Sequence, residues 1–219
     1  GKAIAEALAE NGGKVVICSR KQNECDAVAA EIAAKYGVEA VGISADITKQ
    51  EAIDNLFNSV MEKFGRVDVL VNNAGSAITK RAEELTQEDF DHVLALDLRA
   101  VFFCSQAAGK IMIKQKSGKI ISIASVLGVV ADKQVLPYCV AKGGVLQMTR
   151  ALALEWAKHN IQVNAICPGY VITELNRKEL TDEKIGGGLL RKTAMRRFGE
   201  VEEIAGAAVY LASDASSYT

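Results

Sequence analysis

The sequence has little of several features that mark specialised protein classes. Of its 219 residues only two are proline and 5% are aromatic, whereas 49% are hydrophobic and 24% charged, as in ordinary globular proteins. The net charge of −1 predicts no partner surface for nucleic acid or an anionic membrane. Apolar runs are short, as in Val15–Cys18, and none is long enough to span a bilayer. These absences exclude disordered, collagen-like and membrane-spanning classes.

Cysteine is present without the spacing of a disulfide framework. The five residues are odd in number and form no CxxC pair, and several lie within apolar runs: Cys18, Cys25, Cys104, Cys139 and Cys167. This pattern indicates free thiols in a reducing compartment. We therefore expect a cytoplasmic protein, and no metal site is predicted.

The sequence begins within a helical repeat and stops directly after another one. Residues 1–10 already form a helical repeat, with Ile4 and Leu8 on one face, and no charged or apolar targeting segment precedes them. The chain stops at Ser216–Thr219, just after another apolar helical stretch. We interpret the sequence as a fragment of a longer chain.

Short apolar strands alternate with helical periods throughout the sequence. Continuous Val- and Ile-rich strands in such an alternation predict a mostly parallel sheet covered by helices on both faces, a doubly wound α/β fold. No repeat or linker divides the chain, so residues 1–219 are expected to form one domain. The expected strands are 14–18, 40–43, 67–71, 119–123 and 161–166, and the expected helices are 1–10, 22–36, 49–64, 87–96, 99–114, 138–159 and 200–213.

Small or hydrogen-bonding residues follow every predicted strand. Parallel sheets of this kind bind ligands beyond the carboxyl ends of their strands. The residues at these ends are Ser19, Arg20 and Lys21; Asp46; Asn72 to Gly75; Ala124 and Ser125; and Pro168 and Gly169. The pattern predicts a ligand-binding edge of the sheet.

Tyr138 and Lys142 are four residues apart on a predicted helix and therefore share one face. A free tyrosine, with a pKa of about 10, is a poor acid or base at neutral pH. A lysine ammonium within about 4–6 Å is expected to lower that pKa by about 1–3 units. Ser125, at the end of the preceding strand, adds a hydroxyl that can hold a carbonyl oxygen. An exposed surface pair remains the alternative for Tyr138 and Lys142 considered alone.

Four motifs in order resemble the short-chain dehydrogenase/reductase family. They are Asn72-Asn73-Ala74-Gly75; Ser125 with Tyr138-Cys139-Val140-Ala141-Lys142; Pro168-Gly169-Tyr170-Val171-Ile172-Thr173; and Arg197-Phe198-Gly199 through Ala215-Ser216-Ser217. The resemblance covers essentially all 219 residues. It implies a Rossmann-type fold, with Gly1 as the last glycine of the family's T-G-x-x-x-G-x-G turn. It also implies that the family's first strand, between 14–18 and 67–71, and its last strand are missing.

The resemblance implies a Ser–Tyr–Lys oxidoreductase that uses a nicotinamide cofactor. Ser125 would bind the substrate oxygen, Tyr138 would transfer the proton, and Lys142 would bind the nicotinamide ribose and lower the tyrosine pKa. The residues it assigns to the cofactor are Gly1; Asp46 and Ile47 at the adenine; Asn73, Ala74 and Gly75 along the adenosine; Pro168 and Gly169; and Val171 and Thr173 at the carboxamide. The alternatives are a helix N-cap for Asp46 and a loop hydroxyl for Thr173.

Asp97 departs from the family pattern, which has an asparagine that supports a proton-relay water at this position. Aspartate can serve if the relay uses the main-chain carbonyl, and the role is in doubt if it needs the side-chain amide. Pairing of Asp97 with Arg99 or Lys142 as plain structure is the alternative.

The cofactor is predicted to be NADP rather than NAD. An enzyme that selects NAD carries an acidic residue after this strand, which accepts from the ribose 2′-hydroxyl. This sequence has Ser19, followed by Arg20 and Lys21, and an arginine can bind a phosphate through two hydrogen bonds. An exposed basic turn is the alternative.

The substrate is predicted only as a small carbonyl compound or alcohol. Within the family, 3-oxoacyl thioesters and sugars or polyols are the alternatives, and a catalytically inactive nucleotide-binding regulatory protein is the alternative of another class. Residues 174–198 are expected to form a lid with a hinge at Gly186–Gly188. Its cations, Arg191, Lys192, Arg196 and Arg197, are expected to form a solvated surface, with attraction of an acidic substrate as the alternative.

A homo-oligomer, a tetramer or dimer, is expected from the resemblance. The helices over 99–114 and 138–159 carry apolar residues that one sheet face does not need, and they are expected at an interface: Val101, Phe102, Phe103, Leu146 and Leu152.

Overall fold

The computed structural model describes residues 1–173 and 176–219, and the side chains of these except 179 and 183–185. Its helices are α1 (Lys2–Glu10), α2 (Gln22–Tyr36), α3 (Gln50–Phe64), α4 (Gln87–Leu94), α5 (Ala100–Gln115), α6 (Leu136–Trp156), α7 (Arg177–Thr181), α8 (Glu183–Lys192) and α9 (Val201–Ala212). The π-helical turn η2 (Ala95–Arg99) joins α4 to α5, and short 3₁₀ turns are η1 (Ala82–Glu84), η3 (Val126–Gly128), η4 (Ala157–His159) and η5 (Asp214–Ser216).

The strands are parallel and form two groups. β1 (Val15–Ser19) pairs with β2 (Ala40–Ser44), and β4 (Gly118–Ile123) lies between β3 (Val69–Asn72) and β5 (Ile161–Ile166). Within the described residues no ladder joins β1 to β3. Within each group the strands run in one direction, so their carboxyl ends lie at the same edge of that group.

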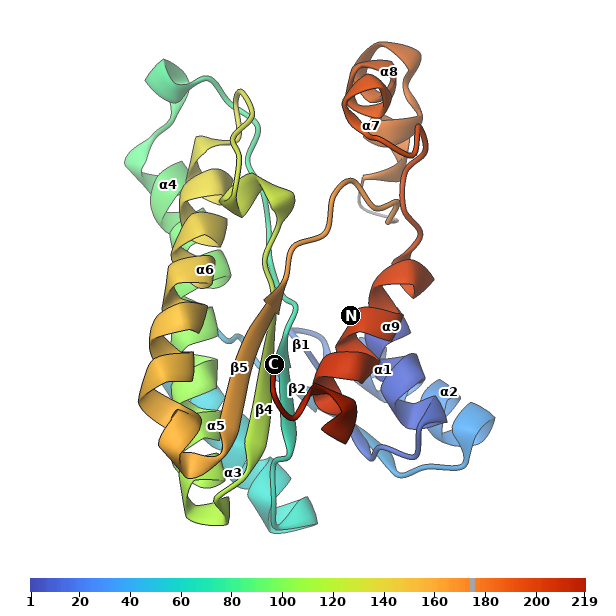
Figure 1. Cartoon of the computed structure of the whole chain (residues 1–219), viewed down its shortest axis with the longest axis vertical. Helices are drawn as coiled ribbons and strands as arrows, with labels where there is room; N and C mark the ends of the chain where they lie inside the picture. Colours follow the sequence, from blue (N-terminus) through green and yellow to red (C-terminus); the bar gives the residue numbers. More distant parts are fainter. Residues whose placement is uncertain (174–175) are drawn as a thin grey trace.

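Helices cover both faces of the sheet. Figure 1 shows α4, α5 and α6 on one side and α1, α2 and α9 on the other. The α/β class predicted from the alternation is thereby confirmed. None of the described helices has the length and apolar character needed to cross a membrane.

The core beside α5 contains large apolar side chains that are almost fully buried. Ile53 from α3, Met112 from α5, and Ile120 and Ile161 from two adjacent strands belong to one cluster. Gly118 is required here, because an added Cβ atom would lie 2.3 Å from the Met112 side chain. Burying these chains stabilises each by about 1.5–3 kcal/mol relative to exposure.

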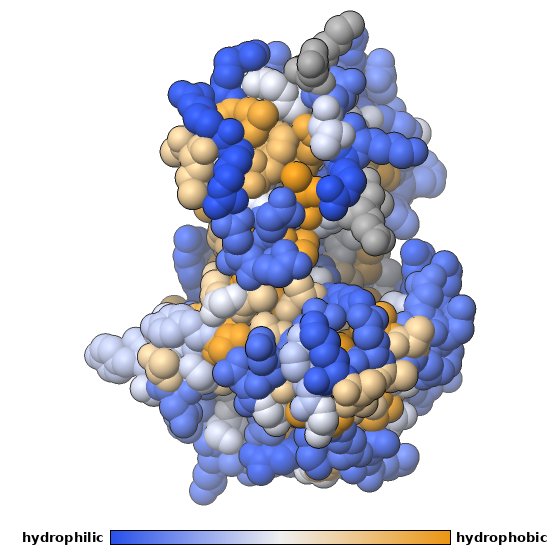
Figure 2. Space-filling model, turned by 90° about the vertical axis from the view of Figure 1, so that its right-hand side faces the viewer, coloured by the Kyte–Doolittle hydropathy of each residue, from blue (hydrophilic) through white to orange (hydrophobic). Residues whose placement is uncertain are grey.

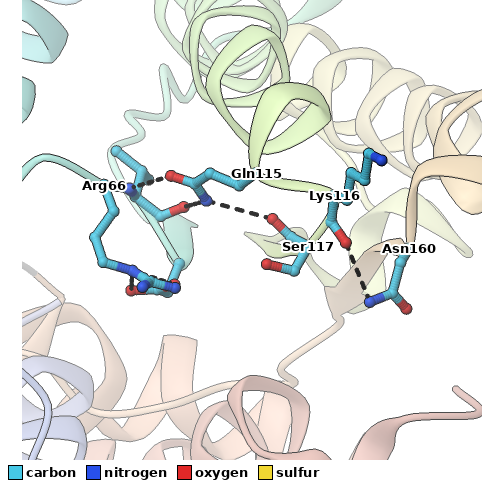
Figure 3. Close-up of polar contacts among 7 residues, drawn as sticks. Arg66, Gln115, Lys116, Ser117 and Asn160 are labelled. Atoms are coloured by element: carbon cyan, nitrogen blue, oxygen red, sulfur yellow. Dashed lines mark hydrogen bonds and ion pairs between the residues drawn. The ribbon is translucent and has the colours of Figure 1, made fainter.

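Gln115, Lys116 and Asn160 form hydrogen bonds at the end of the sheet that is remote from the expected site (Figure 3). The Gln115 amide accepts from the Val67 N–H at 3.0 Å and donates to the Val67 carbonyl at 2.8 Å. Lys116 ends α5 at φ 57°, and its carbonyl accepts from the Asn160 side chain at 3.3 Å. Asn160, at φ 59°, ends η4 in the same way. These bonds fix the entries into β3, β4 and β5.

Several sequence expectations are corrected by the structure. The polar stretch after Thr173 contains two helices, α7 and α8. Gly186 to Gly188 lie inside α8, so the predicted hinge is wrong. A Cβ atom on Gly186 would clash with the Leu180 carbonyl oxygen. Val101 and Leu152, expected at an oligomer interface, are core residues with 4% and 6% exposure. The first two residues of the predicted lid, 174 and 175, lie outside the described residues.

Candidate active site

Ser125, Tyr138 and Lys142 meet at the carboxyl edge of the sheet. Ser125 follows β4 by two residues and is held by its own turn, because its hydroxyl accepts from the Leu127 N–H at 3.1 Å. Tyr138 and Lys142 lie on the first turns of α6, which begins at Leu136 instead of Tyr138. The Lys142 ammonium lies 5.4 Å from the centre of the Tyr138 ring. The helical spacing and the strand end therefore bring the three predicted groups to one place.

Lys142 is buried and has two fixed partners. Its Nζ atom donates to the Ile123 carbonyl at 3.0 Å and lies 3.3 Å from the Asp97 Oδ2 atom. The Asp97 Oδ1 atom accepts from the Ser76 N–H at 2.7 Å. Of the two partners suggested for Asp97 by the sequence, the structure selects Lys142. Arg99 instead donates to the Thr48 carbonyl at 3.2 Å.

The π-helical turn η2 places Asp97 in this site. Such turns are rare and are frequently found at functional sites. Asp97 is completely buried, and its Oδ2 atom has no hydrogen-bond partner within the described part of the chain, although the Lys142 charge is close. Burial raises the pKa of Asp97 above its usual range, while Lys142 and Ser76 oppose that rise. Gly75 is required beside it, because an added Cβ would lie 2.6 Å from Oδ2.

The pKa of Tyr138 is raised, which corrects the expectation of a lowered value. Burial of the phenol is the largest cause, hydrogen bonding with Ser125 lowers the pKa, and the nearby charge of Asp97 raises it. The Lys142 ammonium contacts Asp97 and the Ile123 carbonyl. The spacing correctly predicted which residues meet but not the sign of the shift.

A cavity of about 140 Å³ lies beside these groups, between the start of α1 and the carboxyl ends of the strands. Five residues that the sequence assigned to a cofactor line it: Gly1, Asn73, Pro168, Val171 and Thr173. Apolar side chains from α1, β4 and α9 complete the wall: Ala3, Ile4, Ile123, Val201 and Ile204. The helix N-terminus at Gly1 is suited to phosphate, and the apolar wall to a flat ring. The residues present therefore fit the phosphate and nicotinamide portions of a nicotinamide dinucleotide.

The remaining predicted cofactor residues lie along the same edge. Ala74 and Gly75 are exposed in the segment after β3, and Gly169 is exposed after β5. Ile47 packs against the main core cluster. The Asp46 carboxylate accepts from the Thr48 N–H at 3.1 Å and hydroxyl at 2.7 Å, which lowers the Asp46 pKa. The N-cap of α3 is Lys49, so the alternative of a helix cap at Asp46 is wrong.

The two cationic residues after β1, Arg20 and Lys21, differ in whether a carboxylate already pairs with them. The Lys21 ammonium lies 2.7 Å from the Glu24 carboxylate, in an exposed pair. Arg20 is exposed, forms no salt bridge with any side chain that the structure describes, and acts electrostatically on Asp46. The Ser19 N–H and hydroxyl both lie 3.1 Å from the Cys25 sulfur, which fixes the end of β1. Arg20 is therefore the cation free to meet a ligand.

A contact between the substrate side of the site and the lid was missed by the sequence reasoning. The lid was predicted over residues 174–198, and we call its described part, residues 176–198, the lid segment. The Asp132 carboxylate, in the loop before α6, lies 3.3 Å from the Tyr170 hydroxyl and 3.3 Å from the Lys192 ammonium. At the base of the lid the Ile172 N–H donates to the Gly199 carbonyl at 2.8 Å. No local spacing reveals this contact, since its members come from three separate segments.

Helices α7 and α8 of the lid segment lie beyond the carboxyl edge of the sheet, apart from the helices that cover its two faces (Figure 1). Its surface carries apolar side chains among charged ones (Figure 2). A larger hollow of about 350 Å³, lined by Ile113, Leu154 and Trp156 among others, lies at the far end of α5 and α6 and contains none of the site residues.

Comparison with known proteins agrees with this architecture. The family model described as Enoyl-(Acyl carrier protein) reductase matches residues 1–219. A 3-oxoacyl-[acyl-carrier-protein] reductase of Synechocystis sp. is 40% identical, over 98% of this chain and 85% of the relative.

Two solved structures have nearly the same fold. The gluconate 5-dehydrogenase of Burkholderia cenocepacia in complex with NADP and tartrate has a TM-score of 0.95 at 32% identity, over 100% of this chain and 86% of the other. An NAD⁺-bound xylitol dehydrogenase has a TM-score of 0.95 at 31% identity, over 100% and 90%.

Fold and relatives together define an oxidoreductase that acts on CH–OH or C=O groups and uses a nicotinamide cofactor. The chain belongs to the short-chain dehydrogenase/reductase family, as its motifs predicted.

Proposed function

We propose that this protein, with residues 1–219 as one nucleotide-binding domain, transfers hydride between NADP(H) and a carbonyl or secondary alcohol substrate by a Ser–Tyr–Lys mechanism. The observation that carries the proposal is the meeting of Ser125, Tyr138 and buried Lys142 next to a cavity lined by the predicted cofactor residues. A catalytically inactive nucleotide-binding protein has no need to keep these three groups together.

The cavity residues supply the contacts that a nicotinamide dinucleotide needs. Gly1 at the start of α1 would meet the phosphates, while Val171 and Thr173 would meet the carboxamide. Thr173 is fixed for that role, since its N–H donates to the Asn176 side chain at 2.7 Å and the Asn176 amide donates to the Val171 carbonyl at 2.9 Å. When bound, the cofactor supplies or accepts the hydride.

The protein's own part is to hold the substrate oxygen and move a proton. The Ser125 hydroxyl is positioned by its turn to donate to the carbonyl oxygen. The Tyr138 hydroxyl, beside it, donates its proton to that oxygen in reduction, and in oxidation the Tyr138 phenolate accepts the proton of the alcohol. Lys142, fixed by Ile123 and Asp97, supports the ribose side of the site.

NADP is favoured over NAD by the residues after β1. Ser19 provides no carboxylate to accept from a ribose 2′-hydroxyl, and Arg20 is exposed and not paired with any described carboxylate. A solved relative binds NADP and another binds NAD⁺, so the choice is a property of these side chains and not of the family.

The substrate class is tested by measuring turnover of 3-oxoacyl thioesters, sugar acids and polyols with each cofactor. The readout is the absorbance of the reduced nicotinamide. The relatives' names include acyl-thioester and sugar-acid enzymes, and these two classes are the alternatives for this chain. Turnover of any carbonyl or alcohol supports the proposal. Cofactor binding without turnover across the panel would instead support the regulatory alternative.

We propose further that the protein is cytoplasmic and forms a homo-oligomer, a tetramer or dimer. Five free cysteines accord with a reducing compartment. Leu154 on α6 is 84% exposed and lies in the hollow at the end of α5 and α6, which suits a subunit contact better than the buried residues first suggested. Sedimentation of the protein as a monomer alone at micromolar concentration would refute the oligomer.

A further inference from the structure

We propose that Arg99 is a positioning residue for the adenine end of the cofactor. Its guanidinium holds residues 45–49, which follow β2 and which we call the adenine segment, in the form that accepts an adenine ring. The inference rests on the proposed function, because Asp46 and Ile47 are the residues assigned to the adenine. It goes beyond that function in giving a role to an arginine that acts through the Thr48 main chain.

The first support is the contact that Arg99 makes with a distant part of the chain. Its Nη1 atom donates to the Thr48 carbonyl at 3.2 Å, across a separation of 51 residues. Among the described side chains outside the adenine segment, Arg99 is the one that hydrogen-bonds to this segment. Arg99 therefore ties the start of α5 to the loop that leads from β2 into α3.

The second support is that the Arg99 side chain is itself held in place. Its guanidinium lies 5.5 Å from the centre of the Phe103 ring, which is one helical turn further along. A cation over an aromatic ring is attracted to it, and this contact favours one arrangement of a long arginine side chain. Phe103 and Ile47 both pack against the main core cluster, so the arginine and the adenine segment rest on the same core.

The third support is what Thr48 does with its other polar groups. Its N–H and its hydroxyl donate to the Asp46 Oδ1 atom at 3.1 Å and 2.7 Å, and the Lys49 N–H donates to the Asp46 carbonyl at 2.9 Å. Both Thr48 bonds reach Oδ1, so Oδ2 has no hydrogen bond from the described residues and is available to accept from the amino group of an adenine. Thr48 therefore joins Arg99 on one side to the Asp46 carboxylate on the other.

The two ends of the adenine segment are fixed by other elements, and its middle depends on Arg99. The Ala45 N–H donates to the Ser19 carbonyl at 2.8 Å, and the Lys49 carbonyl accepts from the Ile53 N–H of α3 at 3.2 Å. Without the arginine, the bonds around Thr48 are local to the segment. The fraction of molecules whose segment is in the binding form then falls, and the apparent Kd for a ligand of this segment rises in proportion.

The test measures binding of three probes to the protein without cofactor by isothermal titration calorimetry: adenosine, AMP and nicotinamide mononucleotide. Arg99→Met removes the hydrogen-bond donors and keeps a long side chain. The Kd values for adenosine and AMP are expected to rise by the same factor, about threefold to tenfold, and that for nicotinamide mononucleotide to stay unchanged. Adenosine carries no charge, so a loss confined to AMP would show that Arg99 attracts phosphate by its charge alone and would overturn the proposal. A parent protein that binds neither adenosine nor AMP overturns it as well.

Controls separate positioning from direct contact with the ligand. Arg150→Met is the same change at an exposed arginine on α6, which is bonded to Gln147 at 3.1 Å, and it is expected to leave all three Kd values unchanged. Arg99→Lys keeps a cation and a donor and is expected to lose less adenosine affinity than Arg99→Met. In an Asp46→Ala background Arg99→Met is expected to cost less than about twofold in adenosine affinity, because the carboxylate through which it acts is gone. The full loss in that background would contradict a positioning role.

Hydrogen exchange gives a readout that needs no ligand. In Arg99→Met the Thr48 and Lys49 amides are expected to exchange at least about threefold faster than in the parent, while amides in α6 keep their rates. Unchanged exchange at these two amides would refute the proposal. If Arg99→Met does not fold, Arg99→Gln removes the charge and keeps a polar side chain on the surface, and the same changes in exchange and adenosine binding are expected of it.

Turnover separates this inference from the proposed function. In Arg99→Met the KM for NADPH is expected to rise by the same factor as the adenosine Kd, with a smaller change in kcat. An active enzyme whose kcat falls while adenosine affinity is retained contradicts the role of Arg99 alone. A parent enzyme inactive with every substrate contradicts the proposed function, while adenosine binding and hydrogen exchange still decide the role of Arg99.

Discussion

Arg20 is expected to carry most of the preference for NADPH, and replacing it by alanine is the sharpest test of the cofactor assignment. Two cations follow β1, but only one is free of a described ionic partner. Lys21 is already paired with Glu24 at 2.7 Å, whereas Arg20 is exposed and without a salt bridge to the described side chains. A 2′-phosphate bound beyond Ser19 would therefore meet the Arg20 guanidinium first.

The magnitude follows from the strength of one charge-assisted hydrogen bond. Such a bond contributes about 1.5–3 kcal/mol, and each 1.4 kcal/mol corresponds to a tenfold change in affinity. Because Arg20 is exposed, we expect the lower end, a loss of about tenfold in kcat/KM for NADPH and little change for NADH. Added salt should weaken NADPH use more than NADH use, since the extra interaction is screened.

The assay measures kcat/KM for both cofactors in matched variants. Lys21→Ala is the control cation and is expected to lose less than about threefold, while Glu24→Gln releases Lys21 and is expected to improve NADPH use. Arg20→Asp in a Ser19→Asp background should move the enzyme toward NADH. A parent that prefers NADH, or a larger loss in Lys21→Ala than in Arg20→Ala, would refute the reasoning.

Three further outcomes are expected. Tyr138→Phe should lower kcat by about 10²- to 10⁴-fold with cofactor affinity in fluorescence titration nearly unchanged, and retention of more than about one-tenth of the activity would contradict its role as the proton donor. Asp132→Asn should raise the substrate KM by up to about fivefold at constant kcat, because the exposed ion pair with Lys192 contributes about 0.2–1 kcal/mol. The Asp132 pKa is lowered, so this contact is fully present above the usual aspartate pKa and is lost as the pH falls through the lowered value. An unchanged KM would contradict the role of Asp132. Gly118→Ala should lower the free energy of unfolding in urea by about 1–3 kcal/mol, because the new methyl group clashes with Met112. Gly206→Ala, which has open space around it in α9, should be neutral or raise the free energy of unfolding by about 0.5–1 kcal/mol. Equal unfolding midpoints in the two variants would contradict the packing argument.

The fold and the position of the site were predictable because both depend on short-range patterns. Apolar runs of four to six residues predicted each strand to within two residues, and the parallel order placed their carboxyl ends together. Helices α2 and α3 end at Gly37 and Gly65, which adopt φ values of 68° and 69° that favour glycine. The lid was misread because Gly186 looks like a hinge in sequence, whereas in the structure it allows α7 and α8 to approach.

The pairing of Lys21 with Glu24 was accessible from sequence, since the two are three residues apart at the start of a helix. The contact of Asp132 with Lys192 was not, because sixty residues separate the two side chains and only the packed lid brings them together. The same holds for Val101 and Leu152, whose burial depends on the neighbouring elements and not on their own periodicity.

The sign of the Tyr138 shift shows most clearly where local reasoning ends. Helical spacing correctly brought Lys142 beside Tyr138, and a lysine near a phenol lowers the phenol's pKa when its charge is unopposed. Burial is the largest cause of the raised Tyr138 pKa, and the charge of Asp97 adds to it. Asp97 lies on a π-helical turn forty-five residues before Lys142, and it can approach only because Gly75 has no side chain. Spacing therefore determines which groups meet, whereas the direction of a pKa shift depends on burial and on a third residue that only the folded chain supplies. A tyrosine and a lysine at the right separation therefore predict where a proton-transfer site lies, but not the direction in which the pKa of the tyrosine is shifted.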